Sequence, residues 1–403
     1  MATFLIGYTI IALIILFVIF VLLVSRGIIF RNNAKIQSIF AHPLLIYSLK
    51  RIGSAFISIM LAITATYLLL RLKSRNSICQ SYVENWTKLP YDVREIRCDA
   101  VMRNLGLYAN NFWEVIGQIF NYFYKILPFP KTICVEDAGT EPIYDAFNNI
   151  ISYVKVHDCR TFIIDLGISY KMASGSSSNY VIDIIFGERM MHSFRIGIIA
   201  VVIELVIGYP LGVLMAKYKD GIIDKIGKTY IISIDAIPGV AYYYIWQLLL
   251  VYLIGLPNKY EATNFVSWLA PALTMGLTGM AGIALWVRRF MLDEFNSDYV
   301  KFARSKGISE NRIMYTHVLR NAIVPLIRSI PASILGALLG SFYIENIYGV
   351  PGLGEYLIKA NEYNDLYALQ GIVVVSAFIS IIAYLAGDIV TAMVDPRVSL
   401  ASE

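Results

Sequence analysis

The chain has 403 residues, of which 57% are hydrophobic and only 16% are charged, and its formal net charge is +5. This composition is too apolar for a soluble globular protein of average composition and predicts an all-α polytopic membrane protein. The positive charge lies mainly in segments that flank apolar runs, so it indicates membrane topology rather than a nucleic-acid-binding surface.

Residues 1–43 form the first region of the chain. Within it, residues 4–24 carry no charge and are long enough to cross a bilayer. They lack a positively charged start and a clear small-residue cleavage site, so we interpret them as a retained span rather than a signal peptide. The loop that follows is rich in Lys and Arg, which predicts a cytoplasmic loop and an N-terminus outside. A second apolar run lies within residues 44–72.

Residues 73–192 contain all four cysteines and no apolar run of span length. A segment of this size can be translocated regardless of its charge, so we expect an extracytoplasmic domain, with a helix at about residues 111–127. An even number of cysteines there favours two disulfides of open connectivity. Four free thiols or a metal site are the alternatives, and the lack of a CxxC pair argues against zinc. The cysteines are Cys79, Cys98, Cys134 and Cys159.

Residues 193–403 contain five further apolar runs, and the short basic loops between them fall on the cytoplasmic side. Counting gives seven spans, with the N-terminus outside and the C-terminus in the cytoplasm. Two of the runs carry an acid, Glu204 and Asp235, and intramembrane acids are costly and often functional. These acids are candidate pathway residues, although local pairing would explain them equally well. In a later span, Gly336 and Gly340 have a GxxxG spacing that predicts close helix packing, within the subunit or with a partner.

Residues 288–328 are the longest polar interruption in this apolar half, with eight Lys or Arg against four acids. The excess of basic residues predicts a cytoplasmic segment. Ser297 or Asp298 can cap a short helix that ends before Gly307, which supplies a left-handed residue, and Ser309 opens a second helix. The segment is therefore predicted to be two short helices separated by a glycine turn.

Within this segment, Ala303 and Gly307 are followed by Pro325 at a spacing that resembles the coupling loop of binding-protein-dependent ABC importer permeases. Residues 288–325 are similar to the oligopeptide and dipeptide branch of that family, except that Phe302 replaces the acid that leads the motif. In the family this loop docks into an ATPase subunit. The resemblance assigns ATPase coupling to Tyr299, Ala303, Arg304, Lys306, Gly307 and Ser309.

Two other stretches are similar to the B-type subunit of that branch. Residues 44–72 resemble its opening span, and residues 345–355 resemble its outer segment, where Pro351, Gly352 and Gly354 belong to a Pro-Gly-Leu-Gly motif. The outer segment is an expected gate or docking surface, or else a tight connection required by the fold. The N-terminal span and the cysteine-bearing domain lie outside the resemblance.

The resemblance implies a six-span type I ABC importer permease core with one extra N-terminal span and an inserted extracytoplasmic domain. Such a subunit would lie in the cytoplasmic membrane of the cell and form, with a second permease subunit, the pathway for oligopeptides. An extracytoplasmic binding protein would deliver the peptide, and we expect the inserted domain to contribute to its docking because that domain is predicted to lie outside, beside the pore entrance. Two ATPase subunits would hold ATP and Mg, so this chain would be no enzyme and carry no cofactor. Dipeptides and nickel remain open as alternative cargo.

The residues alone leave other functions open. The sequence has no phosphate loop, metal motif or nucleophile constellation, so the energy for transport must come from an ion gradient or from another chain. One alternative is an ion-coupled secondary transporter that uses Glu204 or Asp235. A second is a membrane receptor whose cysteine-bearing domain binds a ligand while the spans anchor it.

Overall fold

The computed structural model describes residues 43–83, 85–135, 140–144, 150–155, 158–169 and 180–394. The chain is mostly helical and divides into two units. The first unit runs to Gly187 and includes Lys359–Ala377, and the second contains Glu188–Ile358 and the chain from Phe378 to Ser399. The predicted N-terminal span at residues 4–24 lies outside the described residues.

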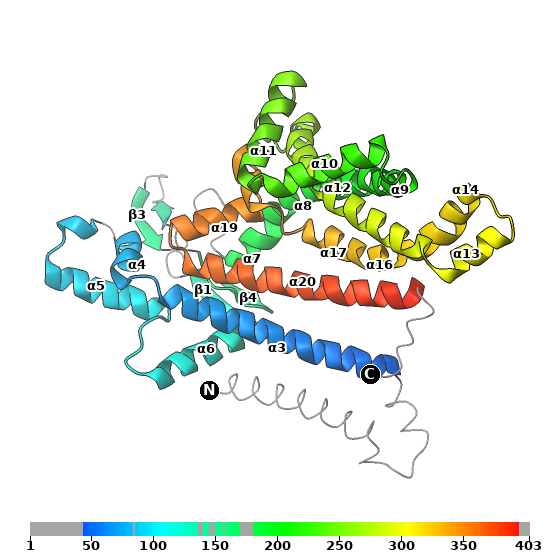
Figure 1. Ribbon diagram of the computed structural model, residues 1–403. Helices are drawn as coiled ribbons and strands as arrows, with labels where there is room; N and C mark the ends of the chain where they lie inside the picture. Colours follow the sequence, from blue (N-terminus) through cyan, green and yellow to red (C-terminus); the bar gives the residue numbers. More distant parts are fainter. Residues whose placement is uncertain are drawn as a thin grey trace, which may run out of the picture. The chain divides into compact units, whose positions relative to one another are not determined.

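The first unit begins with α3 (Pro43–Arg71), which coincides with the apolar run predicted at residues 44–72. Three shorter helices follow along the chain (Figure 1): α4 (Arg75–Tyr82), α5 (Tyr91–Asn104) and α6 (Phe112–Ile126). Asn111 starts α6 because its side-chain oxygen accepts the backbone N–H of Glu114 at 2.9 Å, as expected of an N-terminal cap. The helix predicted at residues 111–127 is thereby confirmed.

Four strands follow α6. The inserted segment, residues 73–192, is therefore not all-α, unlike the rest of the predicted fold. The strand β1 (Lys131–Val135) pairs antiparallel with β4 (Asp158–Phe162), and β2 (Thr140–Tyr144) pairs antiparallel with β3 (Ile150–Lys155). These short stretches are rich in Ile, Val, Thr and Tyr, which suit a pleated strand. The chain then continues into α7 (Val181–Ile184).

The second unit is built around α12 (Phe265–Phe295), which packs against α8 (Met190–Ile203) and α9 (Tyr209–Lys217) (Figure 1). Glycine permits this close packing. A Cβ atom at Gly212 would come within 2.6 Å of the Val287 Cβ atom, which real Cβ atoms essentially never do. The remaining elements are α10 (Ile222–Ala236), α11 (Gly239–Leu248), α13 (Asp298–Ser305), α14 (Glu310–Arg312), α15 (Leu319–Ala322), α16 (Val324–Ile327), α17 (Ser329–Gly336), α18 (Phe342–Tyr348), α19 (Leu353–Glu362) and α20 (Leu366–Val394), with π-helical segments η2 (Ile185–Arg189), η3 (Glu204–Gly208), η4 (Leu249–Leu253) and η5 (Ile313–Val318).

Several helices have the length and composition of membrane spans. Among the described residues, the single helices that qualify are Val181–Lys217, Phe265–Phe295 and Leu366–Thr391. Two bent pairs, Ile222–Ala236 with Gly239–Leu253 and Glu310–Ala322 with Val324–Gly336, raise the number to five if each pair is one span. The three single helices overlap apolar runs predicted in residues 193–403. The two bent pairs overlap two further runs, but the second pair begins at Glu310, inside the predicted polar segment, and the number of spans stays a prediction.

The predicted span around the GxxxG spacing is shorter than the sequence suggested. The helix α17 ends at Gly336, and Gly340 lies beyond it with a left-handed φ of 68°. The two glycines therefore do not form one helix face. The close approach in this region is instead made by Gly197, where a Cβ atom would come within 2.7 Å of the Ala337 Cβ atom.

Candidate functional site

The polar segment predicted to face the cytoplasm has the predicted form of two helices around a glycine turn. Ser297 precedes α13, although its hydroxyl donates to the carbonyl of Glu294 at 2.6 Å and does not cap the helix. The chain turns at Gly307, whose φ of 72° lies in the left-handed region that favours glycine. The second helical stretch starts at α14, directly after Ser309.

One side of this segment is buried. Val300 and Ala303 of α13 belong to an apolar cluster that also contains Val213 of α9 and Met291 of α12. The hydroxyl of Tyr299 donates to the Glu294 carboxylate at 2.6 Å, which attaches the start of α13 to the end of α12. Because interiors are closely packed, a displacement of α13 must also move the ends of α9 and α12.

The opposite side of the segment is exposed. Phe302 is 61% exposed, and the ammonium group of Lys306 lies 4.5 Å from the centre of its ring. The guanidinium of Arg304 donates to both carboxylate oxygens of Glu310, at 2.7 and 3.2 Å, and so spans the turn at Gly307. The six residues assigned to ATPase coupling therefore include a half-buried anchor, Tyr299, a buried anchor, Ala303, and exposed positions suited to a partner surface.

A groove lies beside this segment. Its volume is 430 Å³, and it lies where the ends of α9 and α12 meet α13 and α14. It combines basic, acidic, amide and apolar side chains, so it could hold a side chain of a partner protein. The lining residues are Ala216, Lys217, Tyr218, Lys219, Leu292, Phe295, Asn296, Arg304, Glu310, Asn311 and Met314.

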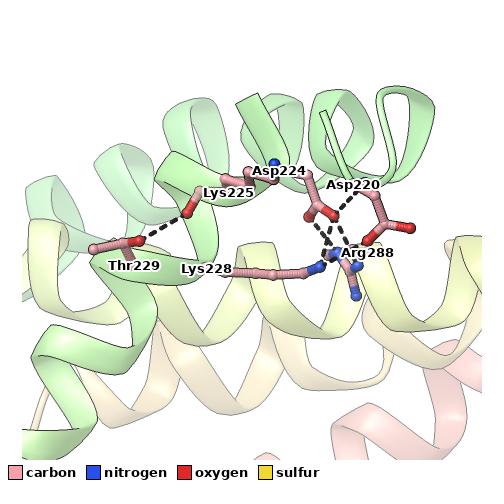
Figure 2. A network of polar contacts seen from close by, with 6 residues as sticks. All are labelled: Asp220, Asp224, Lys225, Lys228, Thr229 and Arg288. Carbon is pink, nitrogen blue, oxygen red and sulfur yellow. Dashed lines mark hydrogen bonds and ion pairs between the residues drawn. The ribbon is translucent and has the colours of Figure 1, made fainter. Parts of the chain in front are cut away.

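A buried ion network joins the start of α10 to α12, as Figure 2 shows. The carboxylate of Asp224 accepts hydrogen bonds from Nε and Nη2 of Arg288 at 2.6 and 3.0 Å. It also pairs with Lys228 at 2.9 Å and accepts the backbone N–H of Asp220 at 2.9 Å. Arg288 opens the polar segment, so this network fixes the loop after α9 against the beginning of the candidate coupling region.

Sequence reasoning missed the ion pair of Asp224 with Arg288. It also missed a second ion pair in the same unit, between Arg328 and Asp388. Arg328, at the end of the polar segment, lies with Nη2 2.7 Å from Oδ1 of Asp388 in α20. An acid inside an otherwise apolar run requires a partner, so Asp388 was recognisable as a candidate for pairing. Its partner was not recognisable, because Arg328 is distant in the sequence.

The outer segment after α17 is organised by Glu345, which sequence reasoning did not single out. Its Oε2 accepts the backbone N–H groups of Gly354 and Glu355 at 2.7 and 3.1 Å, at the start of α19. The hydroxyl of Ser193 accepts the N–H of Leu353 at 2.8 Å. Burial raises the pKa of the Glu345 carboxyl to about 7, and these hydrogen bonds only partly oppose the rise.

The predicted outer motif supplies space for this carboxyl group. A Cβ atom at Gly352 would collide with the Glu345 carboxylate and the Ser193 hydroxyl, and one at Gly354 would lie 2.7 Å from the backbone nitrogen of Phe342. Pro351 is exposed. The two glycines are therefore required for packing, which supports the tight connection as one role of this motif.

The two candidate pathway acids occupy different environments. The Glu204 carboxyl, in the π-helical segment η3, packs against Gly279 of α12. Asp235 is exposed near the end of α10, where the chain bends by 117° before α11. Within the described residues, neither acid has a hydrogen bond or ion pair, and a pathway role for them stays a prediction.

The cysteines of the inserted segment are oxidised where they are described. Cys79 of α4 and Cys98 of α5 form a disulfide, which confirms the predicted presence of such a bond. Cys159 is also disulfide-bonded, and in the register of β1 with β4 it stands opposite Cys134. Within the described residues, no group of three or more His, Cys, Asp or Glu side chains is arranged to hold a metal ion.

The second half of the chain is similar to known membrane components of transport systems. Residues 208–400 match the family described as binding-protein-dependent transport system inner membrane component. The oligopeptide transport system permease protein AmiC of Streptococcus pneumoniae serotype 4 is 34% identical over 233 residues, which is 57% of this chain. The chain spans only 46% of the length of AmiC.

Two further similarities complete the comparison. The dipeptide transport system permease protein DppB of Lactococcus lactis subsp. cremoris is 30% identical over 227 residues, covering 55% of this chain and 74% of that protein. An inward-facing structure of the MetNI methionine ABC transporter aligns with 16% identity and a TM-score of 0.43, covering 52% of this chain and 96% of that chain.

Proposed function

This chain belongs to the family of binding-protein-dependent transport system inner membrane components, and we propose that it is a transmembrane subunit of an ATP-driven peptide importer. The names of AmiC and DppB support oligopeptides or dipeptides as the cargo. A second permease subunit would complete the pathway, and an extracytoplasmic binding protein would deliver the peptide. ATP and Mg would be bound by two separate ATPase subunits.

The observation that supports this function most directly is the two-sided character of the α13 segment. Its buried side is packed with α9 and α12, which have the properties of membrane spans, and its exposed side presents Phe302 and Lys306. A partner that pushes on the exposed side would therefore move spans rather than a loose loop. This is the mechanical property that a subunit driven by another chain's ATP hydrolysis requires.

The turn at Gly307 offers a direct test. A side chain at this position meets open space but a left-handed backbone, so Gly307→Arg should strain and obstruct the exposed side without disturbing the core. We expect the variant complex to assemble, to hydrolyse ATP without stimulation by peptide-loaded binding protein, and to lose uptake. Normal peptide uptake by this variant would contradict the coupling role.

Gly255→Arg is the matched control. Gly255 also has a left-handed φ, 82°, and open space around its missing Cβ atom, but it lies in the predicted outer loop. This variant should keep coupled uptake. Labelled oligopeptide, dipeptide and nickel should be compared as cargo in the same assay. Uptake by the chain without ATPase subunits, abolished by an ionophore, would instead support the ion-coupled alternative.

A further inference from the structure

The helix α6 exposes three of its aromatic side chains. Phe112 and Trp113 are 71% and 77% exposed, and Phe120 is 50% exposed. Positions 113, 117 and 120 follow one another at helical spacing, and Gly117 between the two aromatic residues has open space. A helix on the surface of a soluble domain normally buries such side chains, whereas α6 buries Tyr122 and leaves these three aromatic residues exposed.

The inward side of α6 carries polar groups that fasten it to α3. The Gln118 side chain accepts a hydrogen bond from the Tyr67 hydroxyl at 3.0 Å and one from the Arg71 guanidinium, and it donates to the carbonyl of Tyr108 at 2.6 Å. The buried ring of Tyr122 lies 6.3 Å from that of Tyr67. The outward display of aromatic residues is therefore fixed by specific contacts.

The helix α6 contacts α3, which also exposes apolar side chains. The two helices lie side by side at the end of α3 (Figure 1), where Leu68, Leu69 and Leu72 are also exposed. Between residues 112 and 124 the one charged residue is Glu114, and its carboxylate accepts the backbone N–H of Asn110 at 2.7 Å. The aromatic surface therefore carries only this one charge, and it adjoins α3, whose apolar part runs from Phe56 to Leu69 and which the sequence predicts to be a span.

We propose that α6 lies on the outer membrane surface and inserts Phe112, Trp113 and Phe120 among the lipid headgroups. Trp and other aromatic side chains favour this interface, and amphipathic helices bind it through their apolar side. The inference rests on the proposed function in one respect, the outward location of the inserted domain. Docking of the peptide-binding protein on the same surface is the competing outcome of the test.

The test uses the full chain, assembled with its partner subunits and reconstituted into vesicles that contain brominated lipids. The contribution of Trp113 to fluorescence is the difference between the wild type and Trp113→Phe. We expect bromine near the headgroup to remove about half of this contribution or more, as for an interfacial side chain. Trp86 is the control, because it is partly covered and the Arg94 guanidinium lies 5.9 Å from its ring; its contribution should be almost unchanged.

Matched substitutions separate insertion from general disturbance of the domain. Phe120→Glu should reduce the quenching of Trp113 severalfold, because a charge must leave the interface. Asn121→Glu, next to it on the polar boundary, should leave the quenching unchanged. Equal quenching in both variants and the wild type would overturn the proposal.

Two other results would also decide the question. If Trp113 escapes lipid quenching and becomes shielded from aqueous iodide only when peptide-loaded binding protein is added, the surface docks that protein and not lipid. Unquenched Trp113 together with normal peptide uptake would overturn only the membrane-surface role. Quenched Trp113 in a complex that neither imports peptide nor contains ATPase subunits would overturn the proposed function and leave the lipid contact intact.

Discussion

The carboxyl group of Glu345 occupies the space into which a side chain at Gly340 would project. Its Oε1 atom is the first that a Cβ at position 340 would meet, and Gly340 also has a left-handed φ of 68°. Gly336, one GxxxG spacing earlier, meets nothing within 4 Å. The two glycines therefore have different roles, and the second is part of the structure that holds the outer segment.

Gly340→Ala should be strongly destabilising. A left-handed backbone alone costs an L-residue about 1–2 kcal/mol, and Glu345 would also have to move, so we expect a loss of at least about 2 kcal/mol. Gly336→Ala is the control, and it should be neutral or stabilise α17 by up to about 1 kcal/mol. Thermal unfolding of the purified variants in the same detergent measures both. Equal melting temperatures would show that Glu345 does not constrain this glycine.

Glu345 should make stability depend on pH. Its pKa is raised from 4.5 to about 7, so the folded protein holds the proton more tightly than the unfolded chain does. The associated stability is present in full below about pH 4.5 and is lost as the pH rises through about 7. The shift corresponds to at most about 3 kcal/mol.

The variant Glu345→Gln isolates this effect, because its amide oxygen can still accept the backbone N–H groups of Gly354 and Glu355. Its melting temperature minus that of the wild type should rise as the pH increases from about 5 to about 8. A difference that stays constant over this range would mean that the carboxyl group does not titrate there.

The sequence was most informative about elements that depend on residues close together in the chain, such as single helices and turns. The helices around Gly307 were predictable because a glycine that favours a left-handed turn separates them, although neither Ser297 nor Ser309 caps its helix as expected. The composition of the apolar runs likewise predicted the three single span-like helices of the second half, because about twenty largely apolar residues suffice to cross a bilayer.

Features that depend on distant residues were not predictable in this way. Arg288 and Asp224 are 64 positions apart, and only the packing of α10 against α12 brings them together. The prediction that Gly336 and Gly340 lie on one helix face was wrong, because α17 ends at Gly336. The spacing of two glycines does not indicate where a helix ends. The strands of the inserted segment were missed because runs of about five residues give a weak periodic signal.

The Asp224 network should contribute substantially to stability. Asp224 is 0% exposed and faces both Arg288 and Lys228, so Asp224→Ala leaves one partly buried cation without its acid. Removing one partner of such a pair costs about 3–5 kcal/mol. Unfolding should therefore occur at a markedly lower temperature, and co-purification of ATPase subunits should fall because Arg288 opens the coupling region.

Asp298→Ala is the matched control for that substitution. Asp298 is 97% exposed and pairs with Lys301 at 2.8 Å, a pair that solvent screening makes weak. The two variants remove the same type of side chain from the same unit. If they lower the melting temperature equally, the buried network is not a stabilising connection between α10 and α12.

The disulfide between Cys79 and Cys98 should hold α4 and α5 together. Both sulfur-bearing side chains are buried, and the bond closes a loop with a sequence separation of 19. Replacing both cysteines with Ala should cost the inserted segment about 3 kcal/mol and expose residues 75–104 to proteolysis. The same protease digestion should leave α12 and α13 protected, because they belong to the other unit. In the untreated wild type, a thiol reagent added under denaturing conditions without reductant should label neither residue. Labelling of both would place reduced thiols there and argue against an oxidising, extracytoplasmic location.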